Sequence, residues 1–192
     1  MTDSASDPTH DDRMGPFGWI VPARRGLALV VLLVLTFSLS LWLAALGDPL
    51  ATDAAPSGIV SFELARTAEG ARAVLDSWDA EAREAAMLVQ GVDFLYLLAY
   101  PAFFSLTAIQ IGRRLGGRWL TAAVPLAWAM WLAAPLDAVE NWALIEQLRT
   151  GPDDGAALLA WACAIPKFAL VAVLVGFVLA GLSRLVVRGV RA

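Results

Sequence analysis

Two carboxyls and an amide stand one helical turn apart in the string LDAVENWAL. Asp137, Glu140 and Asn141 are spaced i, i+3 and i+4, so that a helix places them on one side. A second string, AIPKFALV, contains Lys167, the only lysine of the chain. Carboxyls beside an ammonium can form an ion pair, bind a further cation or transfer protons, and these are the chemistries that the residue types allow.

A third string, DFLYLLAY, adds acidic and phenolic groups. Asp93, Tyr96 and Tyr100 are spaced i, i+3 and i+7, again on one side of a helix, and Gln90 lies one turn earlier. Glu63 stands within the apolar stretch IVSFELA, which favours an inward orientation. The candidate ligand-binding set is therefore Glu63, Gln90, Asp93, Tyr96, Tyr100, Asp137, Glu140, Asn141 and Lys167.

The composition excludes several common active sites. Cys163 is the only cysteine and His10 the only histidine. An internal disulfide, a Cys-rich or His-rich metal site and a Ser-His-Asp triad therefore lack their residues. No nucleophile motif and no glycine-rich phosphate-binding motif is present. We expect neither a metal nor a cofactor, and the motifs argue against an enzyme without excluding one.

Four apolar blocks must position these side chains. Of the 192 residues, 59% are hydrophobic, whereas a soluble domain has about half. Each block holds about 20 or more mostly apolar residues, which is enough to cross about 30 Å of hydrocarbon as a helix. The sequence predicts an all-α, four-helix transmembrane bundle with spans at about residues 26–46, 85–111, 119–143 and 157–182.

The polar ends of the chain are expected to lie outside this bundle. Residues 1–23 are polar and acidic, which is typical of a disordered tail. The apolar run that follows is longer than the core of a typical signal peptide, so we expect it to remain as the first span. The predicted organisation is a tail at 1–23, a membrane domain at 24–186 and a second tail at 187–192.

Arginines predict the orientation in the membrane. Nine arginines lie before the first span, between the second and third spans, or after the fourth, and only four lie in the other two loops. The positive-inside rule then places both termini in the cytoplasm. We interpret the arginines as topology signals and expect no nucleic-acid partner. The use of arginine over lysine beside abundant alanine suggests a GC-rich bacterial genome. We expect the protein in the bacterial cytoplasmic membrane, with the lipid bilayer as partner.

The outer loop between the first two spans, residues 47–84, is expected to contain short amphipathic helices. Ala71, Val74, Leu75 and Trp78 follow helical spacing. The start of this helix suits capping by Thr67, and the next helix suits capping by Ser77 or Asp79. Two interpretations stay open for this loop: a surface lid that packs on the bundle, or a gate above a cavity.

The charged residues of the spans are expected to converge in the outer half of the bundle. Asp93, Asp137, Glu140 and Lys167 carry three carboxyls and one ammonium, which leaves a charge of −2 if all are ionised. A protonated carboxyl, a bound cation or an arginine such as Arg66 would close this imbalance. Prolines adjoin Tyr100 and Lys167, where kinks can open a pocket. The alternative is an ion pair that only locks the bundle.

Four strings resemble parts of a group of bacterial four-span membrane proteins that has no assigned function. They are GIVSFELA, DFLYLLAY, LDAVENWAL and AIPKFALV, and the likeness covers residues 55–175. The resemblance implies a four-helix membrane fold. It implies no substrate, cofactor or catalytic residue.

Three functions fit these observations. The first is binding or transport of a small amphipathic or cationic ligand in an outward-facing polar pocket, and the excess of carboxyls favours it. The second is an intramembrane enzyme that acts on a lipid or isoprenoid-like substrate through a carboxylic acid and a carboxylate. The third is a structural subunit of a larger membrane complex. The sequence does not predict an oligomeric state.

Overall fold

The structure of the protein, a computed structural model, describes residues 15–190. Every regular element in this range is a helix, and four helical segments are long and apolar enough to cross a membrane. The prediction of an all-α chain with four such helices is confirmed. The elements are α2 (Pro22–Gly47), the short 3₁₀ turn η1 (Asp48–Leu50), α3 (Ile59–Glu63), α4 (Ala68–Ser77), α5 (Ala80–Leu115), α6 (Arg118–Met130), α7 (Ala133–Thr150) and α8 (Asp154–Val190).

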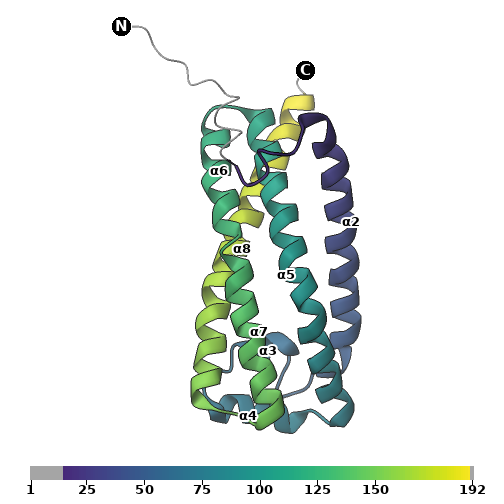
Figure 1. Cartoon of the computed structure of the whole chain (residues 1–192), viewed down its shortest axis with the longest axis vertical. Coiled ribbons are helices and arrows are strands. Elements are labelled where there is room, and N and C mark those ends of the chain that lie inside the picture. Colours follow the sequence, from purple (N-terminus) through teal and green to yellow (C-terminus); the bar gives the residue numbers. More distant parts are fainter. Residues whose placement is uncertain (1–14, 191–192) are drawn as a thin grey trace, which may run out of the picture.

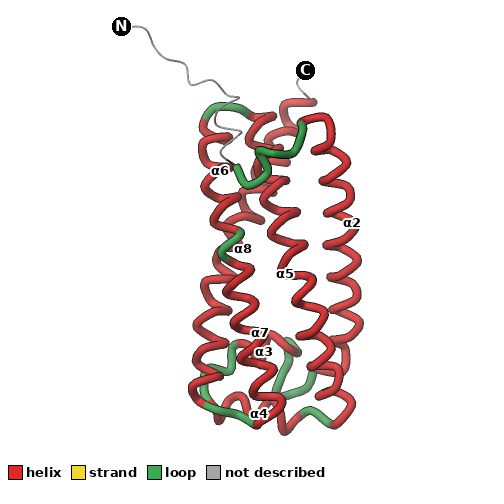
Figure 2. The backbone as a smooth tube through the Cα atoms, in the orientation of Figure 1, coloured by secondary structure: helices red, strands yellow, loops and turns green. Residues whose placement is uncertain are grey.

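The long helices run side by side as an elongated bundle (Figure 1). We call the end with η1, α3 and α4 the loop end, and the end with the α5–α6 turn and Val190 the terminal end (Figure 2). Helix α5 packs on α2, α6, α7 and α8 and is the most buried of the four. Helix α2 packs mainly on α5, and its other faces are exposed and apolar.

The third spanning segment is interrupted where α6 meets α7. The amides of Trp131 and Leu132 bond to carbonyls three residues earlier, at 3.1 and 3.0 Å, instead of four. Pro135 explains the break, because it has no N–H for the carbonyl of Trp131 and its ring crowds that carbonyl. The freed carbonyl of Ala127 accepts a hydrogen bond of 2.8 Å from the hydroxyl of Ser105 on α5. Helices α5 and α8, in contrast, continue through their internal prolines.

The segment between α2 and α5 packs into the loop end as part of the core. Phe62 and Trp78 are buried, with ring centroids 5.5 Å apart, and the indole of Trp78 donates to the carbonyl of Leu50 at 2.9 Å. Thr67 accepts from the amide of Gly70 and caps α4, as predicted. Of the two candidates for the next cap, Asp79 accepts from the amide of Ala82 and caps α5. These contacts fix the loop over the helix ends.

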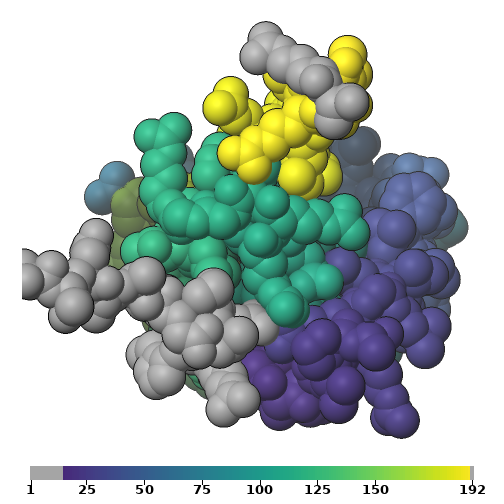
Figure 3. All heavy atoms as spheres, turned by 90° about the horizontal axis from the view of Figure 1, so that it is seen from above, coloured from purple at the N-terminus to yellow at the C-terminus, as the bar shows by residue number. Residues whose placement is uncertain are grey.

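At the terminal end the helices approach closely through glycine. A methyl group added at Gly112 of α5 would lie 2.7 Å from Cβ of Ala123 and 3.0 Å from Cα of Leu120, both in α6. Figure 3 shows the α5–α6 region, in teal, between the purple start of α2 and the yellow end of α8. Residues 15–21 form turns here, and the ring of Phe17 lies 6.2 Å from that of Trp131. Residues 1–14 and 191–192 of the predicted tails lie outside the described residues.

Candidate functional site

Three helices bring charged side chains to one level of the bundle. Asp93 lies thirteen residues from Ala80, the start of α5, and Lys167 lies thirteen residues from Asp154, the start of α8. Asp137 is likewise thirteen residues from the last residue of α7. Each therefore lies about 20 Å from the loop end at 1.5 Å per residue. The equal spacing is what allows side chains from separate helices to meet.

Lys167 is the centre of the cluster. Its Nζ lies 2.9 Å from Oδ1 of Asp137 and 2.8 Å from Oε1 of Glu140, both on α7. Oε2 of Glu63, on α3, lies 3.7 Å away. All four side chains are buried. A buried ammonium is tolerated only when carboxylates compensate it, so α3 and α7 supply the groups that hold Lys167 inside the bundle.

Hydrogen bonds extend the cluster along α5 and toward α2. The hydroxyl of Tyr100 donates to Oδ2 of Asp137 at 2.9 Å, and the amide of Asn141 donates to Oδ2 of Asp93 at 2.7 Å. A single turn of α7 thus contacts both α5 and α8. The hydroxyl of Ser40 on α2 lies 3.2 Å from that of Tyr96, whose ring centroid is 5.1 Å from that of Tyr100. All four spans therefore contribute to the polar region.

Glu63 reaches the cluster because both sides of its short helix are anchored. Its neighbour Phe62 is buried in the core at the loop end. On the other side the backbone turns sharply at Arg66, which has a φ of 61°. The turn lets the amide of Thr67 donate a hydrogen bond of 2.7 Å to the carbonyl of Ala65. The guanidinium of Arg66 stacks over Trp161 of α8 at 4.9 Å. These contacts direct the carboxylate of Glu63 into the bundle.

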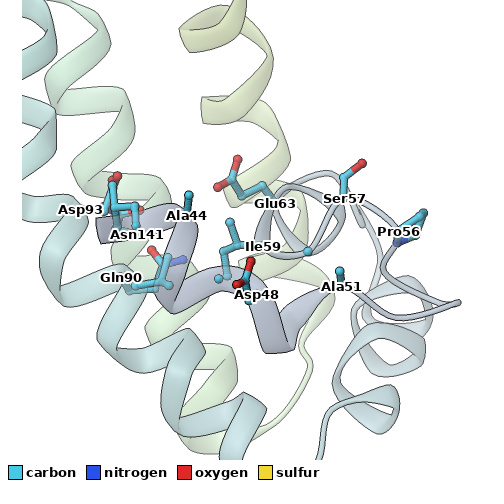
Figure 4. A pocket seen from close by; sticks show the side chains of 14 residues that line it. Ala44, Asp48, Ala51, Pro56, Ser57, Ile59, Glu63, Gln90, Asp93 and Asn141 are labelled. Atoms are coloured by element: carbon cyan, nitrogen blue, oxygen red, sulfur yellow. The ribbon is translucent and has the colours of Figure 1, made fainter. Parts of the chain in front are cut away.

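A pocket of about 390 Å³ opens beside the cluster at the loop end. Figure 4 shows Gln90, Asp93 and Asn141 on one side and Glu63, with the α3 segment, on the other. The carboxylate of Glu63 extends toward the side on which Asp93 lies (Figure 4). We call it the acidic pocket; its lining residues are Leu43, Ala44, Gly47, Asp48, Ala51, Pro56, Ser57, Gly58, Ile59, Glu63, Val89, Gln90, Asp93 and Asn141.

The charge of the region is more negative than the sequence indicated. With Glu63 included, four carboxyls (Glu63, Asp93, Asp137 and Glu140) surround one ammonium, which leaves −3 if all are ionised. Burial raises the pKa of Glu63 above its ordinary value, and the positive charge of Lys167 opposes this rise. The suggestion that Arg66 closes the imbalance is wrong, because its side chain is exposed and stacks on Trp161.

Several buried acceptors of the region have no hydrogen-bond donor. They are Oε2 of Glu63, Oε2 of Glu140 and Oε1 of Gln90. Glu63 and Gln90 both line the acidic pocket. A buried acceptor without a partner costs about 1–3 kcal/mol, and more when it is charged. A molecule that brings N–H donors and positive charge into this pocket would lie beside Glu63 and Gln90, which carry two of these three acceptors.

The structure brings the predicted site residues into one connected region. Glu63, Asp137, Glu140 and Lys167 form its charged centre, and Gln90, Asp93 and Asn141 line the acidic pocket. Tyr96 and Tyr100 lie on the opposite side of Asp93, toward the middle of α5. The sequence reasoning missed Asp48 and Ser40. A hydroxyl within the apolar first span was a signal for Ser40, whereas Asp48 had the pattern of an ordinary loop residue.

Comparison of the chain with protein-family models, curated proteins and solved structures finds no match. The resemblance to four-span bacterial membrane proteins therefore stays a prediction. Among residues 15–190, no group of three His, Cys, Asp or Glu side chains is arranged to hold a metal ion. The carboxyls of the region lie around the pocket and around Lys167, instead of converging on one point.

Proposed function

We propose that the protein binds a small organic cation, such as a protonated amine, in the acidic pocket. The observation that carries this proposal is the lining of the pocket. It includes the carboxyls of Asp48, Glu63 and Asp93 and the amides of Gln90 and Asn141, and no lysine or arginine is among the described residues that line it. A cation in this pocket would offset part of the charge excess, and its N–H groups would meet the unpaired acceptors.

The chemistry of the lining favours an organic cation over a metal ion. Metal ions such as Ca²⁺ and Mg²⁺ require six or more oxygen ligands around one point. The acidic pocket instead spreads its oxygens over a volume of about 390 Å³. A protonated amine needs only two or three acceptors and can use the remaining apolar wall, formed by residues such as Leu43 and Val89.

We propose that the loop end faces away from the cytoplasm. The excess of arginine near the terminal end supports this orientation. The acidic pocket then receives its ligand from outside the cell or from the outer part of the membrane. Binding, or binding followed by transport, is the resulting function, and the membrane is proposed to be the bacterial cytoplasmic membrane.

Saturation-transfer NMR on the purified protein, with butylamine as probe at pH 7, tests this proposal. We expect transfer to butylamine and none to butyrate, which has the same number of carbon atoms and the opposite charge. Asp93→Asn keeps the acceptor for Asn141 but removes the charge, and we expect it to weaken butylamine binding at least tenfold.

The matched control is Asp76→Asn, because Asp76 is acidic but exposed, with 71% of its side-chain surface accessible. It should bind butylamine as the unmodified protein does. Equal binding of butylamine by Asp93→Asn and Asp76→Asn would rule the acidic pocket out as a cation site. Equal transfer to butyrate would show that charge does not select the ligand.

A further inference from the structure

A second pocket, of about 250 Å³, adjoins the acidic pocket. Glu63 and Asp93 line both, so the two pockets meet at these carboxyls. Beyond the charged groups, the second pocket is mainly aromatic and aliphatic. We call it the side groove; its other lining residues are Val60, Tyr96, Tyr100, Phe104, Asp137, Lys167, Phe168 and Val171.

The apolar walls of the side groove come from two helices. Tyr96, Tyr100 and Phe104 follow one another at four-residue intervals and share one side of α5. Phe168 and Val171 lie three residues apart on α8 and form the opposite wall. From Tyr96 to Phe104 the groove extends about 12 Å along α5 at 1.5 Å per residue. This length suits an alkyl chain.

The side groove lies between α5 and α8, and Val60 and Glu63 of α3 border it toward the loop end. Tyr96 and Tyr100 lie at the middle of α5, and so at the depth where hydrocarbon surrounds the bundle. Helices α2 and α8 both flank α5, but they do not pack broadly on each other. Within the described residues, the seam between α5 and α8 is therefore accessible from the side, at the level of the bilayer interior.

We infer that the ligand is a single-chain amphiphile with an amine head group, which reaches the site laterally from the bilayer. The inference rests on the proposed cation site and names its ligand class. The amine lies between Glu63 and Asp93, where the two pockets meet, and the alkyl chain lies in the side groove.

The arrangement around Lys167 fits this placement. Asp137 and Glu140 approach its ammonium at 2.9 and 2.8 Å, whereas Glu63 is more distant at 3.7 Å. Asp93 accepts a hydrogen bond at Oδ2, and its donor is the neutral side-chain amide of Asn141. Of the four carboxyls in the region, Glu63 and Asp93 are thus the two that accept no hydrogen bond from the ammonium of Lys167. A fatty acid, with the opposite charge, would meet acidic groups at the same point.

Photocrosslinking in lipid nanodiscs tests the inference. The probe is dodecylamine that carries a diazirine near the end of its chain. We expect mass spectrometry to find the label on α5 near Phe104 and on α8 near Val171. Excess dodecylamine should reduce this labelling at least fivefold, and dodecanoic acid should not.

Two variants of α8 provide a matched pair. Val171→Trp fills the side groove and should lower the specific labelling at least fivefold, while butylamine still binds in the acidic pocket. Val173→Trp adds the same bulk at a position with 57% exposure that faces away from the groove, and labelling should persist. If Val171→Trp fails to fold, the two competitors on the unmodified protein still decide the question.

The outcomes separate the two proposals. Butylamine binding without competed labelling in the side groove would overturn the amphiphile and leave the cation site standing. If the label spreads evenly over exposed faces such as that of α2 and excess dodecylamine does not reduce it, the amphiphile is likewise overturned and the cation site stands. Competition by dodecanoic acid as strong as that by dodecylamine would exclude the amine head group. If butylamine does not bind to the unmodified protein, the proposed cation site itself is refuted.

Discussion

In the half of the bundle toward the loop end, helices meet through an ammonium, carboxyls and amides, whereas at the terminal end they meet through glycine and alanine. Lys167 joins α8 to α7 and α3 by contacts of 2.8–3.7 Å. Gly112 lets α5 approach α6 so closely that an added methyl would lie 2.7 Å from Ala123. Both devices hold helices together where burial of apolar surface gives little driving force, as in a membrane.

The two ends differ in what they respond to. Close packing of small residues depends on shape alone and is insensitive to pH or to a charged ligand. A cluster of buried ionisable groups changes its energy whenever a proton or a cation binds. The proposed function would make the loop-end half a region of both cohesion and binding, whereas the terminal end would supply a rigid base. Substitutions at the two ends should therefore have separable effects.

The largest effect is expected from Lys167→Met. It removes the ammonium of the only lysine and leaves the buried carboxyls of Asp137 and Glu140 without their partner at 2.9 and 2.8 Å. Loss of one partner from a buried ion pair costs about 3–5 kcal/mol. We expect a loss of this size in the free energy of unfolding, measured by SDS titration in mixed micelles.

The triple variant Lys167→Met, Asp137→Asn, Glu140→Gln serves as the control. It removes the opposing charges and should recover most of the stability lost in Lys167→Met. If the single variant is as stable as the unmodified protein, ion pairs do not hold the loop end together and the contrast between the two ends disappears.

A smaller effect is expected from Gly112→Ala at the terminal end. The new methyl would meet Cβ of Ala123 and, at 3.0 Å, the backbone of Leu120, and neither can move away as a flexible side chain would. Overpacking of this kind costs about 1–3 kcal/mol. SDS titration should show the loss, and butylamine binding should not change.

Gly91→Ala in the same helix is the comparison for this substitution. A methyl at Gly91 meets no atom within 4 Å, and alanine favours a helix over glycine by about 1 kcal/mol. We expect Gly91→Ala to be neutral or stabilising. The same destabilisation in both variants would mean that close packing at Gly112 is not what joins α5 to α6.

The smallest effect is a pH dependence that belongs to Glu63. Because its pKa is raised in the folded chain, the folded state binds more protons than the unfolded state between the ordinary and the raised value. Stability should therefore fall as the pH increases upward from the ordinary pKa of a glutamate. SDS titrations over a pH series should show this slope, and Glu63→Gln should flatten it.

Gly112→Ala lowers stability at the other end and leaves Glu63 in place, so it should retain the full slope. A slope that persists unchanged in Glu63→Gln would assign the pH dependence to another group. Equal flattening in both variants would show that the two ends are coupled more strongly than their contacts indicate.

Hydropathy and spacing predicted much of this architecture because they are local properties of the chain. Runs of apolar residues predicted the four spans, and the i, i+3, i+4 spacing predicted the shared face of Asp137, Glu140 and Asn141. The cap at Thr67 followed from its position before a periodic segment. The orientation in the membrane stays a prediction.

Other features depend on how separate segments meet, and local patterns do not contain this information. The pair of Ser40 and Tyr96 depends on the rotation of α2 against α5, which apolar residues on every side of α2 leave open. The place of Asp48 in the acidic pocket depends on the path of the loop. The break before Pro135 was within reach of the sequence, because a proline disrupts the turn that precedes it.

The uneven distribution of charge between α7 and α8 has a consequence for the synthesis of the protein. The third span is the least hydrophobic of the four: its apolar 18-residue stretch has a mean hydropathy of 1.4, whereas the corresponding stretch of the fourth span has 2.5. An aspartate at the centre of a helix adds about 2.5–3.5 kcal/mol to the free energy of insertion. The ribosome completes the third span before the residue that neutralises it exists. We therefore expect the third span to enter the lipid together with the fourth, as one helical hairpin.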